Sequence, residues 1–351
     1  MMFTDSPNIR MQGDGLLHRM VRRIWKARKC LTVVIGILCT VAAAPTSGQT
    51  NPYPRETIRL VIPFTAGGPT DVAARLLAKE LGARLGQSIV PDNRPGASSA
   101  LGAEVVAHAA PDGYTLLFGS SILTTWSLIP GSNVPSDVVS DFALIGKVAR
   151  SDEIVVVPSR LKINDLRGLV NLMRTDPSKV QFGSSGIGSQ GHVGGELLKY
   201  LTKTDALHIP YKGESAALTD LLGGRLTFML CTPASCEPRI QDGTLKGLAV
   251  TSKVRSTSAP AIPTVAEASV PGMEVGPWWY LAAPKGTPEA IVDKLNTALN
   301  QVLADEKFRS RLRALGLESE PGTTPAAVRS ELQAEVTKWR PVIQAAKITA
   351  Q

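Results

Sequence analysis

Short apolar runs alternate with segments of helical periodicity along most of this 351-residue chain. Apolar runs bounded by turn residues are typical of buried strands, and apolar positions that recur every three or four residues are typical of amphipathic helices. Strands that alternate with helices of moderate length predict βαβ units and a mostly parallel sheet. Strands are expected at 58–64, 88–90, 115–118, 142–148, 154–157, 180–182, 207–210, 226–230 and 248–251, with helices between them at 71–85, 99–109, 165–175, 191–201, 215–222 and 234–242.

The pattern changes near the C-terminus, where three amphipathic helices follow one another at 288–305, 306–315 and 325–346. Thr287-Pro288 and Thr324-Pro325 each resemble a helix cap followed by proline at the first helical position. The end of the chain is therefore expected to be helical.

A glycine-rich turn at 64–71 connects the first expected strand to the first expected helix. It contains Gly67 and Gly68, and Thr70 is in position to be the helix N-cap. Such a turn directs main-chain N–H groups and the positive end of a helix dipole toward one point, which suits a carboxylate or phosphate oxygen. The alternative is a tight turn in which glycine is needed only for positive φ. Asp71 is expected to hold backbone donors in place rather than to act as a catalytic acid.

A second unit of strand, glycine-rich loop and helix covers 180–201, and its loop at 183–191 alternates glycine with serine. Two such loops that face each other across a cleft would hold one small anion from both sides.

The second loop also matches a dinucleotide fingerprint, G-x-G-x-x-G, at residues 186–191. The first glycine of that motif normally follows the strand directly, and an acidic residue stands about 20 positions later. Here the glycine comes later and no suitable acidic residue follows. No nucleotide cofactor is therefore predicted.

The serines of this loop leave an exported serine hydrolase as an alternative. His192 follows Ser189 by three residues, but no G-x-S-x-G element surrounds the serine and no orienting acid is marked. His192 is expected to cap or pack at the start of its helix.

Composition and charge favour an ordinary globular protein that is long enough for two domains. The formal net charge is +8, but residues 1–48 hold seven basic and two acidic side chains, which leaves +3 for the rest. No dense basic stripe remains, so nucleic acid is not an expected partner.

Residues 1–48 have the features of a secretory signal peptide. A basic stretch at 22–29 precedes an apolar run at 31–44 that is too short to span a bilayer, and small residues follow it. Cleavage is expected near 44–48, and Met11 or Met20 are alternative starts. Arg22-Arg23 gives a weaker match to a twin-arginine signal. A periplasmic location is expected.

Cys231 and Cys236 are the two cysteines that follow the expected signal. In a compartment where disulfides persist they form either a small-loop disulfide or two buried thiols, and their spacing does not decide between these. They fall short of zinc-ligand spacing, so no metal site is predicted.

Trp278-Trp279-Tyr280 precedes the C-terminal helices. Alternate side chains of a strand share a face, so one tryptophan is expected in the core and the other toward a cleft or a helix.

The chain resembles a known family, the Bug-type solute-binding receptors of the tripartite tricarboxylate transporter. The resemblance runs from about residue 53 to residue 348. Its motifs stand in one order at 53–54, 58–64, 67–75, 93–97, 111–116, 183–192, 210–213, 220–224, 248–252, 263–267, 283–288, 294–296 and 338–339.

The resemblance implies an α/β fold of the periplasmic binding protein type II class, with two α/β domains around a ligand cleft. Domain 1 would comprise 51–150 plus 252–351 and domain 2 would comprise 151–251, with hinge strands near 154–157 and 248–251. Backbone amides and ordered waters of the first loop meet a ligand carboxylate in the family, and the second loop closes on it. The implied ligand-binding residues are Phe64, Thr65, Ala66, Gly67, Gly68, Thr70, Asp71, Ser120, Ser184, Ser185, Gly186, Gly188, Ser189 and Cys231.

Several positions depart from the family pattern. Ala66 stands where the family usually has proline, Arg239 replaces a common histidine, and the segment from 119 to 142 is divergent. Cys231 stands where the family often has aspartate. The loss of that acidic group argues against a ligand with an ammonium group.

The expected function is that of an extracytoplasmic receptor, not an enzyme, that captures a small carboxylate by hinge closure. The receptor would act as a monomer and deliver its ligand to membrane permease subunits. The alternatives are a receptor that presents its ligand to a two-component sensor and, less favoured, the hydrolase. Aliphatic di- or tricarboxylates, amino acids and aromatic acids all suit a carboxylate clamp.

Overall fold

The computed structural model describes residues 53–350, except 97–98, 133, 135–138 and 257–258. The signal peptide expected at 1–48 lies outside the described residues. None of the helices in the described part of the chain is both long and apolar enough to cross a membrane.

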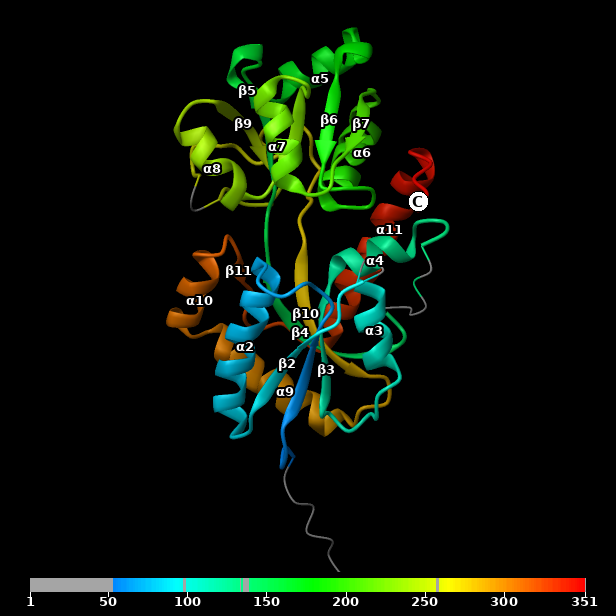
Figure 1. Ribbon diagram of the computed structural model, residues 1–351, viewed down its shortest axis with the longest axis vertical. Coiled ribbons are helices and arrows are strands. Elements are labelled where there is room, and N and C mark those ends of the chain that lie inside the picture. The colour runs from blue at the N-terminus through cyan, green and yellow to red at the C-terminus, as the bar shows by residue number, and fades with distance from the viewer. Residues whose placement is uncertain (1–52, 97–98, 133, 135–138, 257–258, 351) are drawn as a thin grey trace, which may run out of the picture. The chain divides into compact units, whose positions relative to one another are not determined.

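The first of two sheets has six strands in the order β11-β4-β10-β3-β1-β2 (Figure 1). β1 pairs in parallel with β2 and β3, whereas β10 runs antiparallel to β3 and β4, and β11 runs antiparallel to β4. The strands are β1 (Ile58–Ile62), β2 (Ile89–Asn93), β3 (Thr115–Ser120), β4 (Phe142–Arg150), β10 (Trp278–Pro284) and β11 (Glu318–Ser319).

The second sheet has five strands in the order β7-β6-β8-β5-β9. β6 pairs in parallel with β7 and β8, and β5 runs antiparallel to both β8 and β9. The strands are β5 (Ile154–Pro158), β6 (Gln181–Ser184), β7 (Leu207–Pro210), β8 (Phe228–Cys231) and β9 (Leu245–Val250).

The prediction of mostly parallel sheets is wrong. The chain passes from the first sheet to the second between β4 and β5 and returns between β9 and β10 (Figure 1). A strand that enters from the other sheet runs against the strands of the local βαβ units, so β5 and β10 are antiparallel to their neighbours.

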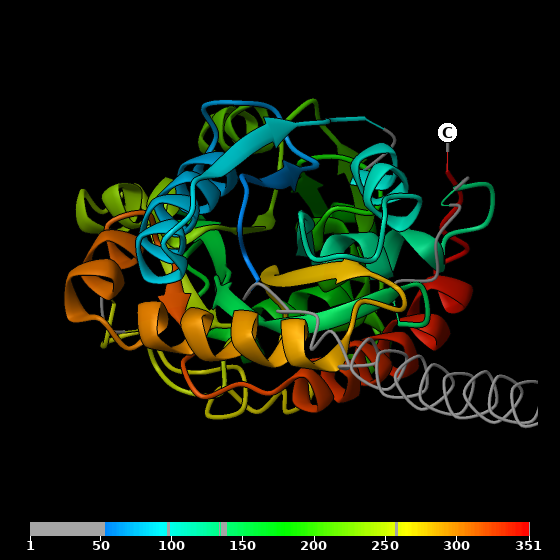
Figure 2. The ribbon, with the colours of Figure 1, turned by 90° about the horizontal axis from the view of Figure 1, so that it is seen from below.

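Helices cover both faces of each sheet, and each face buries its own apolar cluster. α2 (Pro69–Leu85), α9 (Glu289–Leu303) and α10 (Glu306–Arg313) pack on one face of the first sheet, with α3 (Ala100–Ala107), α4 (Ser121–Ser127) and α11 (Pro325–Ala345) on the other. Figure 2 shows α9 in orange and α11 in red. The second sheet lies between α5 (Leu166–Thr175) with α6 (Gln190–Thr202), and α7 (Glu214–Gly223) with α8 (Pro233–Gln241).

Trp278 and Trp279 lie on opposite faces of β10, as alternation predicts. Trp279 packs in the cluster beneath α2 and α9, and Trp278 in the cluster beneath α3 and α11. Both side chains are buried, and Trp278 packs toward helices, which is one of the two alternatives that the sequence left open for the second tryptophan.

α11 packs against both sheets. Its first half contributes Val328 and Leu332 to the core of the first sheet. Its second half places Trp339, Val342 and Ile343 in the core beneath α5 and α6. The C-terminal helix therefore stabilises the packing of both parts of the fold.

The two segments that link the sheets are hydrogen-bonded to each other. Thr251 N donates to Glu153 O, and Glu153 N donates to Thr251 Oγ1, each over 2.8 Å. Glu153 directly precedes β5 and Thr251 directly follows β9. The two linking segments therefore lie side by side, at the positions where the chain enters the second sheet before β5 and leaves it after β9.

Cys231 and Cys236 form a disulfide, with their Cα atoms 6.2 Å apart. The bond joins the last residue of β8 to the first turn of α8. Of the two alternatives that the sequence left open, the structure has the small-loop disulfide.

Helix starts agree with the sequence in part. Thr324 caps α11 and accepts a hydrogen bond from Ala327 N, as predicted. The N-cap predicted at Thr70 is wrong, because α2 starts at Pro69 and Gly68 is its N-cap. α9 likewise starts one residue later than predicted, with Pro288 at the N-cap.

Candidate functional site

The loop at 64–68 joins β1 to α2 and is held by its own backbone conformation. Gly67 has φ +88°, a left-handed value that suits glycine. Thr65, Ala66 and Gly67 are exposed, and Phe64, Gly68 and Thr70 are half-buried.

Asp71 ties this loop to the first turn of α2. Its carboxylate accepts the main-chain N–H of Gly67 at 2.9 Å, Arg75 Nε at 2.9 Å and Asn93 Nδ2 at 2.8 Å. Asn93 Nδ2 also donates to Phe64 O at 3.0 Å. Burial alone would raise the pKa of Asp71, but the hydrogen bonds from Arg75, Gly67 and Asn93 together lower that pKa to about 2. The backbone contact expected of Asp71 is therefore present, and the group is a carboxylate at neutral pH.

The same loop keeps main-chain donors free. The N–H groups of Ala66, Gly68 and Thr70 donate to no other residue within the described chain. Together with the dipole of the 17-residue helix α2, they present the kind of donors that suit an anion at the start of a helix.

The second loop, at 185–189, joins β6 to α6 and is built in the same way. Ser189 is the N-cap of α6, where its Oγ accepts from His192 N at 3.3 Å and donates to Gly186 O at 2.7 Å. The N–H groups of Ser185 and Ile187 donate to no other described residue. Ser185 is exposed, whereas Gly186 and Ser189 are half-buried.

Ser184 ends β6 beneath this loop and is buried. Its Oγ accepts from Gly186 N at 3.2 Å and lies 2.7 Å from His208 Nε2 on β7. His208 stacks on His192, with ring centroids 3.7 Å apart. The loop therefore rests on a pair of stacked histidines, and no local pattern indicated this role of His208.

Both histidines are uncharged at neutral pH. Burial, followed by the charge of Lys199, lowers the pKa of His192 to about 4. Burial, followed by His192 and Lys199, lowers the pKa of His208 to about 3. His192 Nδ1 accepts the main-chain N–H of Gly188 at 3.0 Å, so the ring positions the loop from below.

The geometry does not form the Ser–His pair that a hydrolase needs. The hydroxyl of Ser189 bonds to Gly186 O and to the main chain of His192, not to its imidazole ring. The ring nitrogen Nδ1 of His192 accepts a hydrogen bond from Gly188 N and so is not available to the serine. His192 packs at the start of its helix, as predicted.

The second loop contacts α4 of the first sheet. A Cβ atom added at Gly188, where φ is +72°, would lie 2.9 Å from both Ile129 Cδ1 and Trp126 Cε2. Ser120 is the N-cap of α4, and its Oγ accepts from Ile122 N at 3.3 Å. Ser120 is buried, so its Oγ serves the helix cap in this structure.

The side chain of Cys231 lies elsewhere. It is fully buried, disulfide-bonded and packed in the apolar cluster beneath α7 and α8. Only its main chain is left for the ligand contact that the sequence predicted.

Buried polar side chains without a partner in the described chain lie near these elements. They include Thr124 Oγ1 on α4, Glu153 Oε2 at the sheet link and both amide atoms of Gln190 on α6. None of them was predicted, because each lies in a segment whose local pattern indicates only a turn or a helix start.

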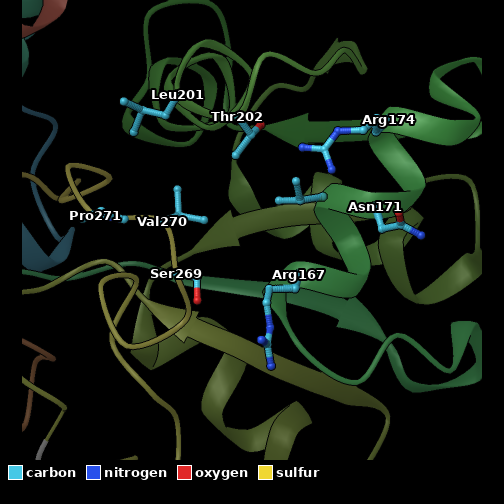
Figure 3. Close-up of a pocket in the computed structure, with 9 residues that line it drawn as sticks. Arg167, Asn171, Arg174, Leu201, Thr202, Ser269, Val270 and Pro271 are labelled. Atoms are coloured by element: carbon cyan, nitrogen blue, oxygen red, sulfur yellow. The ribbon is translucent and has the colours of Figure 1, made fainter.

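Two further cavities lie away from both loops. One of about 630 Å³ is lined by Arg167, Asn171 and Arg174 of α5 and by Leu201 and Val270 (Figure 3). Another of about 590 Å³ adjoins the sheet links and contains Lys147, which pairs with Glu331. Among the described residues, no cluster of three or more histidine, cysteine or acidic side chains could hold a metal ion.

The fold has two mixed sheets covered by helices, two hydrogen-bonded segments that connect them, and a donor-rich loop on each sheet. These features define a two-domain binding protein. The family model of the tripartite tricarboxylate transporter family receptor matches residues 73–348, and the chain belongs to this family. Proteins of this family are extracytoplasmic solute-binding receptors of the Bug type, and the chain has the periplasmic binding protein fold.

Relatives and solved structures agree with this assignment. The chain is 36% identical over 319 residues to Protein BugT of Bordetella pertussis, covering 90% of this chain and 96% of that one. The structure of the periplasmic binding protein BugD superposes with a TM-score of 0.69 at 33% identity, covering 85% of this chain and 100% of BugD. R. palustris Rpa4515 with adipate gives a TM-score of 0.71 at 34% identity, covering 85% and 99%.

Proposed function

We propose that this chain is a periplasmic receptor that captures a small carboxylate between the loops at 64–71 and 184–189 and delivers it to a tripartite-type membrane permease. The observation that carries the proposal is the paired arrangement of α2 and α6. Each helix begins at a loop with unpaired main-chain N–H groups, and the two loops belong to different sheets. The family, and a structural neighbour solved with adipate, support a carboxylate ligand.

A carboxylate suits these loops better than a phosphate dianion. No arginine or lysine side chain lies in either loop, so the loops offer dipoles and N–H donors without a formal positive charge. We assign the contacts to the N–H groups of both loops, with Asp71 and His192 as the residues that hold those loops in position.

Capture would occur by closure of two domains, 51–150 plus 252–351 and 151–251. The links at Glu153 and Thr251 are the natural hinge, because two hydrogen bonds fix them to each other between the two sheets. The contact of Gly188 with α4 gives the second loop a docking point on the first domain. Ligand contacts made only in the closed form would drive closure. The receptor would act as a monomer and have no enzymatic activity.

A thermal-shift panel of small carboxylates tests this function. The purified chain, stripped of ligand by unfolding and refolding, is heated alone and with each acid. A ligand at about 100 times its dissociation constant should stabilise the fold by about 2.7 kcal/mol. Arg174→Ala, in the cavity away from both loops, should respond as the wild type does. If no acid raises the melting temperature of the wild type, the receptor function is contradicted.

Delivery to a permease needs a separate measurement. Cells that lack this chain should lose uptake of the acid identified by the panel, and restored expression should recover it. Uptake that is unchanged without the chain would contradict delivery while leaving the binding function intact.

A further inference from the structure

α11 is a further segment that passes from one sheet to the other, in addition to the links before β5 and after β9. Its first half contributes Val328 and Leu332 to an apolar cluster of the first sheet, and both side chains are at most 1% exposed. From Trp339 onward the helix belongs to a cluster of the second sheet, where Trp339, Val342 and Ile343 are equally buried. The two halves of one continuous helix are therefore anchored in different cores.

Hydrogen bonds join α11 to both links. Glu153 and Thr251, one from each link, bond to each other. Val275 N donates to Thr251 O at 3.0 Å, which adds the segment that leads into β10. Lys338 Nζ, in α11, donates to Glu274 O of that same segment at 2.9 Å. One row of contacts thus runs from the first link through the second link to the helix.

Pro341 weakens α11 close to this row of contacts. Proline has no N–H, so the carbonyl of Thr337 lacks the donor that an uninterrupted helix would supply, and the proline ring crowds that carbonyl. Pro341 itself is exposed, whereas Val342 and Ile343 beside it are buried. Helices bend most readily where a proline interrupts their hydrogen bonds. The weakest turn of α11, at 337–341, therefore lies where the helix passes from one core to the other.

The part of the chain that follows Pro341 is fixed to the second sheet. Ile348 is 5% exposed in the cluster beneath α5 and α6, and Ile129, which follows α4, is 2% exposed in the same cluster. Ala350 N donates to Pro130 O at 3.0 Å, so the segment after α4 holds the end of the chain. Any displacement between the two cores must therefore be taken up by α11 before this part.

The first half of α11 is fixed to the first sheet by charge as well as by packing. Lys147 of β4 is 5% exposed and pairs with Glu331 of α11 at 2.7 Å and with Glu320 at 2.9 Å. A cavity of about 590 Å³ separates this side of α11 from the links, and Glu331 and Lys338 of the helix line it together with Ser252. The helix thus has free space beside it in which to bend.

We propose that α11 is a third hinge segment of this receptor, and that Pro341 lets the helix bend when the two domains close on the ligand. The inference rests on the proposed function, because closure on a carboxylate is part of that function. A rotation about the row of Glu153, Thr251 and Lys338 would carry the end of α11 with the second domain while the first half stays on the first sheet. A stiff helix of 21 residues would oppose this rotation, since it would have to leave one core or break its own hydrogen bonds. Pro341 therefore sets how readily the receptor closes.

Two proline-to-alanine variants test the inference. Pro341→Ala restores the missing N–H and replaces proline by the best helix former, so it stiffens α11 beside the hinge. Pro238→Ala is the matched control. Pro238 is also exposed and inside a helix, but the buried residues of α8 belong to a cluster of the second sheet. Both variants should be at least as stable as the wild type in thermal unfolding, so a change in domain motion would not arise from damage to the fold.

Distances between spin labels report the motion without any ligand. Labels are attached to cysteines introduced at Lys79 on α2 and Ala216 on α7, which are exposed and belong to different sheets. Double electron–electron resonance then measures the distribution of distances in the ligand-free mature chain. Pro341→Ala should narrow this distribution, and Pro238→Ala should leave it as in the wild type. Equal widths in Pro341→Ala and the wild type would overturn the inference, as would equal narrowing in both variants.

The rate of closure gives a second readout. Stopped-flow mixing with succinate or adipate, followed by tryptophan fluorescence, measures the rate at saturating acid. Pro341→Ala should lower that rate about threefold or more, because residues that absorb a hinge rotation control its speed, while Pro238→Ala should not lower it. A rate that is the same in Pro341→Ala and the wild type would contradict the inference. Failure of the receptor function is distinguishable, because then neither acid binds while the label distances still report whether Pro341 controls the motion.

Discussion

The carboxylate of Asp71 accepts the main-chain N–H of Gly67 over 2.9 Å and so ties the loop before α2 to the first turn of that helix. Asp71 belongs to the helix and Gly67 to the loop, so the hydrogen bond couples a rigid element to the backbone expected to meet the ligand. Arg75 and Asn93 complete the support of the carboxylate. The loop is thereby held in one conformation before a ligand arrives.

Replacing Asp71 by alanine should therefore damage both stability and binding. The change removes the acceptor of the Gly67 N–H and one of the two acceptors of the Asn93 amide, at a cost of about 2–3 kcal/mol in the free energy of unfolding. Carboxylate affinity should fall about tenfold or more, because the donors are no longer fixed. Denaturant titration and calorimetry measure the two effects. Arg75→Gln is the control, since it keeps the bond to Gly67, and equal losses in both variants would contradict this role of Asp71.

The stacked histidines predict a loss of stability in mild acid. The pKa values of His192 and His208 are about 4 and about 3 in the fold, against an ordinary value of 6.5. Their contribution is thus fully present above pH 6.5 and is lost as the pH falls, by up to about 1.4 kcal/mol per pH unit for each ring. His208→Gln should show a shallower decline than wild type between pH 6.5 and 4.5. Parallel stability curves for the two proteins would exclude a role of this histidine.

Glu153 predicts the opposite trend on the alkaline side. Its pKa is about 8 in the ligand-free fold and 4.5 ordinarily, so its stabilising contribution is complete below pH 4.5 and is lost as the pH rises toward 8. Glu153→Gln should gain stability over wild type as the pH is raised from 6 to 9. Thermal unfolding across this range measures the difference. A difference that does not change with pH would show that Glu153 ionises normally.

The disulfide predicts that the folded chain has no free thiol among its described cysteines. Thiol titration of the mature protein in denaturant should find none at Cys231 or Cys236, and two after reduction. Removal of the crosslink by Cys231→Ala with Cys236→Ala should cost about 2 kcal/mol, as expected for a short closed loop. Two reactive thiols in the unreduced protein would favour the alternative of buried free cysteines.

The periodic apolar segments of the sequence predicted most of the helices and strands. The elements and strand directions that they did not predict have physical explanations. β10 was not among the expected strands, although its apolar run at 278–284 is of the kind typical of a buried strand and Trp278-Trp279 was interpreted by strand alternation. The segment of α4, 121–127, is short and rich in serine and threonine, so it lacks the stripe of a helix. The strand directions depend on where the chain crosses from one sheet to the other, and no local sequence pattern indicates these crossings.

The two loops could be predicted because glycine and a polar cap between a strand and a helix is a local signal. The burial of Glu153 and the position of His208 could not be predicted from a local signal. Asp152-Glu153 resembles a solvated turn, and its burial arises from pairing with Thr251, 98 residues away. His208 lies on β7, 24 residues from Ser184, and only the parallel pairing of β6 with β7 brings them together. Local pattern therefore indicated the two donor-rich loops, whereas the burial of Glu153 and the support of the second loop by His208 come from long-range pairing.

Calorimetric titration of glycine variants tests the central claim, that both loops hold one carboxylate. Gly67 and Gly186 have positive φ in the first and second loop, and Gly243 has φ +78° at the far end of α8 with no atom within 4 Å of an added Cβ. Each is changed to alanine, so that all three variants place an alanine at positive φ. Gly67→Ala and Gly186→Ala should each weaken binding of the best acid about tenfold or more, while Gly243→Ala should bind as wild type does. Unchanged affinity in either loop variant would contradict a site shared between the two loops.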